Sequence, residues 1–415
     1  MTATQTDHGS GAPLRVVIAG AGVAGLETLI ALREMADDRV QVTLVSPDDD
    51  FVYRPLSVGE PFALGPARRI PVAQLARDFH AGHRREGLAS VDPDAYTIAL
   101  ANGESLPYDK LVVALGARRE PVYAHSVTFR GQEDSEALHG LVQDVEGGYS
   151  RKIIFVVPPG VPWSLPLYEL ALMTAERAFS MSIEVELALV TPEERPLAVF
   201  GRKASDDVGA LLEQAGVRVY CSTTVEVPRQ GTVVLRPGGE TLTCDRVVAL
   251  PVVRGVPVEG LPHDPEGFLP IDSHARVSRV SDVYAAGDGA NFPLKQGGIA
   301  CQQADAGAED IARAAGIPVE ARPFRPVLRG RLMTGGKPHF MRRDIGDPTG
   351  AGESTDHMLW WPPTKIAGKY LAPYVALQQK REGKAAVQGG QESLLASAVN
   401  EAGELKLHGY EFAAR

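Results

Sequence analysis

The sequence predicts an α/β protein with two interleaved Rossmann-like folds, each a doubly wound, three-layer unit, followed by a C-terminal region. Two observations predict this class. An apolar run at 14–20 ends in a glycine-rich turn, and a helix pattern and a second apolar run at 40–45 follow it. A similar unit begins at Lys152. The 415 residues also exceed what one hydrophobic core normally serves, so two or more domains are expected.

Each unit reads as strand, helix and strand. The first helix pattern covers 27–35, with Leu26, Leu29, Ile30 and Leu32 on one stripe. In the second unit we expect a strand at 153–157, a helix at 166–179 and a strand at 183–190, with 208–253 completing the unit. Residues 95–117 read as a hairpin and a returning strand between the units.

The closing strand of the first fold is expected after residue 273, so the second fold interrupts the first. We therefore place the first domain at 14–149 and 255–321, and the second at 150–254. Residues 322–415 would form a C-terminal cap or interface, irregular because it is rich in proline, with a flexible link at 384–391 before a last helix. Residues 1–12 read as a disordered lead-in.

Composition excludes several classes of function. A net charge of −10 argues against a generic nucleic-acid binder, since phosphates need a broad cationic surface. No apolar run approaches the roughly 18 residues that a transmembrane helix needs. The cysteines, Cys221, Cys244 and Cys301, are too few and too scattered for a disulfide framework, which favours a reducing, cytoplasmic location.

The turn after the first apolar run has the spacing of a dinucleotide phosphate loop. Gly20 permits the tight turn, Gly22 lets the backbone approach a pyrophosphate, and Gly25 allows close packing of strand and helix. With Ala24 these residues form the expected phosphate contact, and the helix N-terminus supplies N–H donors to the anion. An acidic ribose ligand is expected after the second strand, but Ser46 stands there. Its hydroxyl, or one of the aspartates at 48–50, is the alternative ligand.

Three further segments resemble the flavoprotein superfamily with two dinucleotide-binding domains. Residues 108–117, with Ala114 and Gly116, are similar to its returning strand beside the FAD pyrophosphate. Residues 283–288 are similar to the segment whose aspartate, here Asp288, binds the ribityl chain. Residues 53–57, with Arg54, resemble the loop near the isoalloxazine in ferredoxin-type reductases. The resemblance implies an FAD-dependent oxidoreductase.

Within this superfamily the chain looks most like sulfide:quinone oxidoreductases and type II NADH dehydrogenases. Lys295, Gly297 and Gly298 resemble their lysine-glycine turn before the helix that faces the flavin. Such a helix would direct its N-terminal dipole at the pyrimidine edge of the ring and stabilise negative charge there. Lys295 is thus expected near the flavin or substrate, or else on the surface.

The chain departs from these relatives in its cysteines. The paired cysteines of the disulfide reductases are absent between residues 46 and 65. Sulfide:quinone oxidoreductases carry a redox cysteine before a Pro-x-Tyr-Glu segment, and here Trp163 fills that place ahead of the segment at 166–169. We expect Trp163 to stack on a flat substrate, Cys301 to pack on its helix, and Cys221 and Cys244 to lie in the core.

Glu169 matches a family glutamate on the nicotinamide side of the flavin. Here it can bind a substrate or Lys295, or merely cap a surface. The second phosphate loop contains Pro158, Pro159 and Pro162 where relatives have glycines, so N–H donors are missing and the usual NAD(P)H pose is doubtful.

We expect a two-electron FAD oxidoreductase without a cysteine relay, acting on a small molecule or a quinone. Aromatic and apolar residues at 360–374 suggest a quinone site, a membrane-surface contact or a homo-oligomer interface. The alternatives are an NAD(P)H-dependent reductase of a quinone or a redox protein, and a non-catalytic flavin-binding sensor or assembly partner.

Overall fold

The computed structural model describes residues 12–385, 406–407 and 410–411, with side chains described for 12–378. The expected lead-in and most of the expected flexible link therefore lie outside the described residues. Within the described part, no helix is long and apolar enough to span a membrane.

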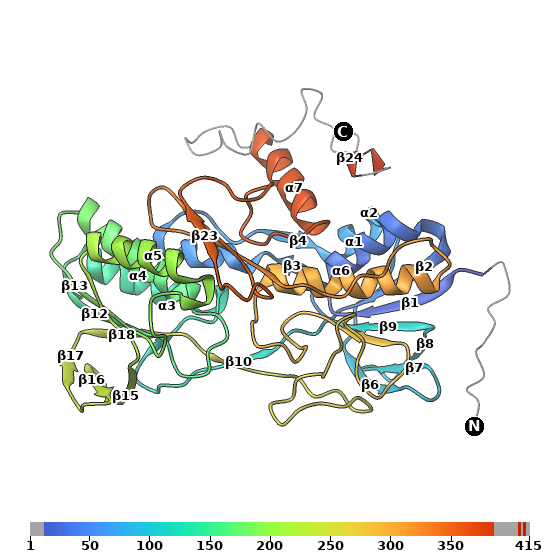
Figure 1. Cartoon of the computed structure of the whole chain (residues 1–415), viewed down its shortest axis with the longest axis horizontal. Coiled ribbons are helices and arrows are strands. Elements are labelled where there is room, and N and C mark those ends of the chain that lie inside the picture. Colours follow the sequence, from blue (N-terminus) through green and yellow to red (C-terminus); the bar gives the residue numbers. More distant parts are fainter. Residues whose placement is uncertain (1–11, 386–405, 408–409, 412–415) are drawn as a thin grey trace.

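The first sheet is parallel and has the order β20-β9-β1-β2-β5. Its register pairs Leu14 with Val40, and Val16 with Lys110. Helices α1 and α6 pack beside each other above this sheet (Figure 1). The bounds are β1 Leu14–Ala19, α1 Val23–Ala36, β2 Val40–Val45, β5 Gly82–Arg84, β9 Lys110–Val113, β20 Val283–Ala285 and α6 Gly297–Ala314.

The second sheet is also parallel, with the order β11-β18-β12-β13-β14, and α3, α4 and α5 lie above it (Figure 1). In chain order, all the strands of this sheet come after β9 and before β20 of the first sheet. Strand β11 precedes residue 150, and the other four follow it. The domain boundaries themselves stay a prediction. The bounds are β11 Val127–Thr128, α3 Ser135–Glu146, β12 Lys152–Val156, α4 Leu165–Ser180, β13 Glu186–Val190, α5 Arg202–Gln214, β14 Val217–Tyr220 and β18 Arg246–Ala249.

A small antiparallel sheet covers the other face of each parallel sheet, so each fold has three layers. Val91, Ile98 and Leu100 pack on the first sheet, and Val225 and Val233 pack on the second. These findings confirm the predicted fold class. The bounds are β6 Leu88–Asp92, β7 Thr97–Leu100 and β8 Ser105–Pro107, then β15 Thr224–Arg229, β16 Thr232–Arg236 and β17 Thr241–Thr243.

Short elements complete the description of these two folds. Strand β10 pairs with β19, and β3 pairs with β4. The 3-10 helix η2 packs against α3 and α4. The bounds are β3 Asp50–Val52, η2 Arg54–Phe62, β4 Arg69–Pro71, α2 Val72–Asp78, β10 Arg118–Glu120, η3 Gln132–Asp134, η4 Ala198–Phe200 and β19 Val252–Arg254, with η1 at Asp37–Arg39.

The prediction that the chain is irregular after Arg322 is wrong. Strands β21 (Val327–Leu332), β22 (His339–Asp344) and β23 (Gly352–Thr355) form an antiparallel sheet. Leu328, Gly330 and Leu332 alternate with more exposed residues along β21, so a period of two was present despite the nearby prolines. Helix α7 (Leu371–Ala385) follows, and two short strands, β24 (Lys406–Leu407) and β25 (Tyr410–Glu411), pair near the C-terminus.

The C-terminal sheet docks on the second fold and α7 on the first. Leu328, Leu332 and Met341 belong to the core that contains α3, α4 and α5. Phe200 is fully buried there, and a Cβ on Gly330 would lie 2.5 Å from its ring. On the other side, Leu371, Tyr374 and Val375 join the core of the first fold. Residues 356–370 therefore connect the two folds; we call residues 362–370 the strap.

We expect Phe200→Ala to destabilise the protein by about 3–5 kcal/mol, because it opens a cavity between α4, α5 and the C-terminal sheet. The matched control is Phe179→Ala, since Phe179 is 81% exposed. Urea unfolding should show the lower free energy of unfolding of Phe200→Ala, while the control should lie within about 0.5 kcal/mol of wild type. Equal midpoints for Phe200→Ala and wild type would contradict the packing described.

Candidate functional site

The predicted phosphate loop lies at the carboxyl end of β1, as the spacing required. A Cβ on Gly25 would lie 1.9 Å from the Gly20 carbonyl oxygen, and a Cβ on Gly20 would lie 2.3 Å from the Ala114 oxygen. The chain itself therefore explains these two glycines. Gly22 differs, because its Cβ would meet only the Ala114 oxygen, at 4.0 Å. Its glycine is consistent with room kept for a ligand rather than with internal packing.

Two other predicted segments meet this loop. A Cβ on Gly287 would lie 3.2 Å from Ala24 Cβ, and a Cβ on Gly289 would lie 2.9 Å from the Gly116 oxygen. Small side chains allow this approach, and the cluster consists of Ala24, Ala114, Ala286, Ala300 and Ala304. The carboxyl ends of β1, β9 and β20 thus form one edge, where ligands bind in open α/β sheets.

Asp288 lies at this edge beside Arg119. The Arg119 guanidinium is 3.5 Å from the Asp288 carboxylate, and this carboxylate partly opposes the burial that lowers the pKa of Lys295. Burial lowers the pKa of Arg119, and Arg54, exposed at the start of η2, adds to that lowering. Sequence reasoning missed Arg119, which carries no motif of its own.

Ser46 follows β2 and is fully buried next to the loop. Its hydroxyl accepts a hydrogen bond from the Asp48 N–H at 3.3 Å, and Gly20 N–H donates to Val45 O at 2.8 Å. Asp49 pairs with Arg85 at 2.6 Å. Ser46 is thus nearer the loop than that aspartate, and its role as a ribose ligand stays a prediction.

Lys295 is half-buried rather than on the open surface. Its ammonium donates to Ala290 O at 2.5 Å and lies 3.7 Å from the centre of the Phe268 ring. Burial lowers the pKa of Lys295 to about 8. Gly297 and Gly298 follow at the N-terminus of α6, where the Gln296 side chain accepts from Ile299 N–H at 2.9 Å.

Glu169 neither binds Lys295 nor caps a surface. It is fully buried on α4, and its two carboxylate oxygens lie 2.7 and 2.6 Å from Lys365 Nζ. Met333 N–H donates to the same carboxylate at 2.8 Å. Burial raises the pKa of Glu169, and Lys365 opposes that rise. No local pattern indicates this partner, which lies 196 residues away in the proline-rich segment.

The strap also binds the other predicted ring-side segments. Ile366 N–H donates to the Tyr53 hydroxyl at 2.8 Å, one residue before Arg54. A Cβ on Gly297 would lie 2.7 Å from Ile366, so the strap crosses the N-terminus of α6. Arg331, from β21, donates to Pro363 O at 3.1 Å. Tyr53, Glu169 and the start of α6 thus surround one stretch of the strap.

The far end of the strap is held by a buried carboxylate. Glu27 on α1 accepts from Tyr370 N–H at 3.0 Å and from Leu371 N–H at 2.6 Å, which caps α7. The Cys301 thiol also donates to Glu27, and burial raises the pKa of this thiol well above its ordinary value. Such a thiol is a poor nucleophile.

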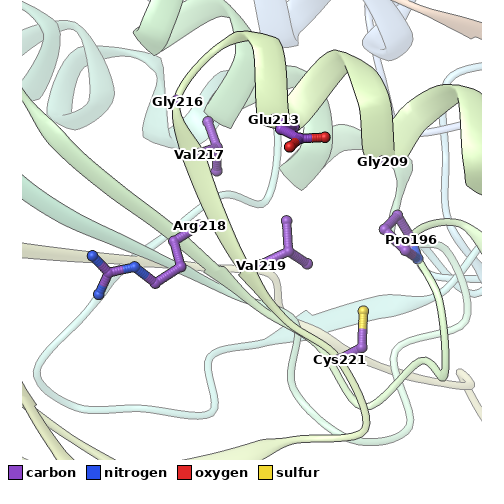
Figure 2. Close-up of a pocket in the computed structure, with 8 residues that line it drawn as sticks. All are labelled: Pro196, Gly209, Glu213, Gly216, Val217, Arg218, Val219 and Cys221. Carbon is purple, nitrogen blue, oxygen red and sulfur yellow. The ribbon is translucent and has the colours of Figure 1, made fainter.

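Of the remaining cysteines, Cys244 packs against the core of the second fold, whereas Cys221 lies beside a groove rather than in the core. Cys221 and Cys244 are half-buried and lie just beyond β14 and β17. All three cysteines are free. Cys221 lines an open groove of about 460 Å³ along β14, between Pro196 and the Glu213 turn of α5 (Figure 2). This groove contains none of the predicted site residues.

The second phosphate loop holds Trp163 against the interior of the second fold. Its ring packs edge-on against Phe200, with centroids 5.8 Å apart, so much of the indole serves packing. Glu193 follows β13, where an acidic residue binds ribose in dinucleotide folds. Its carboxylate instead accepts from Tyr168 OH at 2.6 Å, Thr191 OH at 2.9 Å and Ser164 OH at 3.1 Å. Sequence reasoning did not single out Glu193.

Comparisons with known proteins agree with this arrangement. A sulfide-quinone reductase from Aquifex aeolicus is 30% identical over 166 residues, a match that spans 38% of each chain. A demethylphylloquinone reductase from Synechocystis is 25% identical, over 66% of this chain and 72% of the relative. The crystal structure of the Aquifex aeolicus sulfide:quinone oxidoreductase superposes with a TM-score of 0.74 at 20% identity, covering 82% of this chain and 86% of that one.

The family comparison covers most of both parallel sheets. Residues 14–154 and 168–308, more than half of the chain, match the family described as pyridine nucleotide-disulphide oxidoreductase. These ranges include the first glycine loop, Glu169 and Asp288. The chain is therefore an oxidoreductase that belongs to the pyridine nucleotide-disulphide oxidoreductase family.

Proposed function

We propose that this chain is an FAD-dependent oxidoreductase that transfers two electrons at the flavin without a cysteine relay. The observation that carries the proposal is the edge formed by the loop at 20–25, the turn at 114–116 and the turn at 287–289. Of the glycines there, Gly22 and Gly116 face open space, since a Cβ on Gly116 would meet no atom within 4 Å. When bound, FAD supplies the electron-accepting ring.

The chain's own residues fit both ends of such a cofactor. The α1 N-terminus offers N–H donors and a positive dipole end to a pyrophosphate. Asp288, beside Arg119, offers a carboxylate to a ribityl hydroxyl. The start of α6, which the strap crosses, would offer another positive helix end to the ring. Ser46 is the candidate for the ribose.

The substrate of this proposed enzyme is a small molecule, with a quinone as the favoured acceptor. The support is the printed activity of two relatives, a sulfide-quinone reductase and a demethylphylloquinone reductase. No cysteine is assigned to the reaction, because Cys301 is buried beside a carboxylate and Trp163 occupies the place of the relatives' redox cysteine. A soluble, cytoplasmic enzyme remains part of the proposal.

Two features of the second fold disfavour NAD(P)H in its usual pose. Pro158, Pro159 and Pro162 remove N–H donors from the loop that would hold a pyrophosphate. Glu193, the candidate ribose ligand, already accepts three hydrogen bonds from this chain's own hydroxyls. We therefore rank an NAD(P)H-dependent reductase below the proposed activity, although ferredoxin reductase components are among the relatives.

A pair of glycine variants tests the cofactor proposal. Gly22→Ala should fold, because its Cβ has space and φ is −80°, yet it should bind FAD about tenfold or more weakly, a loss of about 1.4 kcal/mol or more. Gly25→Ala should lose stability itself, because its Cβ would lie 1.9 Å from a carbonyl oxygen. Circular dichroism and titration of apoprotein with FAD separate the two effects. A folded Gly22→Ala with wild-type FAD affinity would refute the pyrophosphate position.

We expect NADH and NADPH to reduce the bound flavin slowly, because the second loop lacks donors and Glu193 is occupied. Anaerobic stopped-flow mixing, followed at the flavin absorbance band, measures the rate. Dithionite is the control, since it should reduce the same flavin rapidly without a nucleotide site. Fast reduction that saturates at low NADH or NADPH concentration would favour an NAD(P)H-dependent reductase over the proposed activity.

A further inference from the structure

Asp288 is one of the two central residues of a tight turn that follows β20. The N–H of Ala290 donates to Gly287 O at 3.0 Å and closes this turn around Asp288 and Gly289. Gly287 has a φ of +87°, a conformation that residues with a Cβ rarely adopt. The direction of the Asp288 side chain therefore depends on how the backbone of Gly287 is held.

A side chain from α6 holds that backbone. The preceding residue, Ala286, still donates to Val113 O of β9 at 3.2 Å, but β9 ends at Val113. The N–H of Gly287 instead donates to Gln303 Oε1 at 2.8 Å. Because an N–H needs an acceptor, this bond identifies the oxygen of the amide and leaves Nε2 as its other atom. Gln303 thus supplies the acceptor that the sheet no longer offers where the turn begins.

Gln303 is almost fully buried, yet only one side of its amide is used. The residue is 1% exposed, and Nε2 has no hydrogen-bond partner in the described part of the chain. A buried N–H without an acceptor is unfavourable, and an apolar residue of similar length would avoid that cost. Packing alone therefore does not explain a glutamine at this position, whereas the bond to Gly287 does.

The carboxylate of Asp288 is held separately from its backbone. Arg119, on β10, lies 3.5 Å from one of the carboxylate oxygens. The side chains of Arg119 and Asp288 are 29% and 26% exposed, so the pair is partly open to solvent. Gln303 and Arg119 belong to different elements and contact different atoms of the turn. The hold on the backbone can therefore be removed while the ion pair remains.

We propose that Gln303 is a positioning residue for the flavin. By holding the N–H of Gly287, it directs the Asp288 carboxylate towards the ribityl chain. Its contribution to FAD binding passes through that carboxylate and not through a contact of its own with the cofactor. This inference rests on the proposed FAD-dependent function and assigns a role to a residue that lies outside the glycine motifs.

A double-mutant cycle tests whether Gln303 acts through Asp288. The variants are Gln303→Met, which keeps the length of the side chain without the amide, Asp288→Ala, and the two combined. Each apoprotein is titrated with FAD. We expect Gln303→Met to weaken FAD binding about tenfold in the wild-type background and by less than about twofold in the Asp288→Ala background. A general structural role would weaken binding equally in both backgrounds.

The matched control is Gln378→Met on α7. Gln378 is 7% exposed and also has an Nε2 atom without a partner among the described residues, but the described structure gives it no hydrogen bond to the turn. This control should keep the wild-type affinity for FAD. Gln303→Glu keeps an oxygen acceptor beside Gly287 and should bind FAD more tightly than Gln303→Met does. The melting temperature of the Gln303→Met apoprotein should stay close to that of wild type, because Gly287 is only half-buried.

An equal loss of FAD affinity from Gln303→Met in both backgrounds would overturn the inference. An apoprotein of this variant that unfolds well below wild type, or fails to fold, would overturn it as well by assigning Gln303 a structural role. The same holds if Gln303→Glu binds FAD no better than Gln303→Met. Wild-type protein that binds no FAD would instead refute the proposed function, so the two failures are distinguishable.

Discussion

The arrangement of the site depends on the buried ion pair between Glu169 and Lys365. Removing two charges from water costs several kcal/mol per ion, and short contacts of 2.6 and 2.7 Å with an added backbone N–H offset that cost. Loss of one partner leaves an unpaired buried charge, which costs about 3–5 kcal/mol. Since Glu169 belongs to α4 and Lys365 to the strap, this pair fixes the C-terminal chain on the second fold. Glu27 fixes the same strap on the first fold through the start of α7.

The fold class and the edge of the first sheet could be predicted from the sequence because both depend on local patterns. The strand predicted at 40–45 has those bounds in the structure, and the helix predicted at 166–179 is α4 at Leu165–Ser180. The glycine loop and the segments around Ala114 and Asp288 meet because parallel strands bring their carboxyl ends together.

The strap and its charges could not be predicted in the same way. Lys365 follows two prolines and a threonine, and no local pattern distinguishes a buried lysine from an exposed one. Its partner is 196 residues distant, so only the tertiary structure joins them. Arg331 lies on β21, where buried and more exposed residues alternate. The prolines around this strand led to the wrong prediction of an irregular segment. Glu169 was a predicted site residue, and the structure pairs it with Lys365 rather than with Lys295.

The second fold keeps the architecture of a nucleotide-binding unit while its polar groups are used internally. Tyr168 and Glu169 are neighbours on α4, yet their side chains bind different parts of the protein. Tyr168 binds Glu193 within the second fold, and Glu169 binds the strap. Trp163, in the loop before α4, packs on Phe200. The start of α4 therefore links the second fold to the C-terminal chain.

The central claim is that electrons pass at a flavin alone, with no thiol pair as a second carrier. An anaerobic reductive titration of the purified, flavin-loaded protein with dithionite, followed by absorbance, tests it most directly. The account predicts complete reduction with two electrons per chain and no thiolate-to-flavin charge-transfer band. Uptake of four electrons per chain, with such a band at the midpoint, would contradict it by revealing a redox-active pair among Cys221, Cys244 and Cys301.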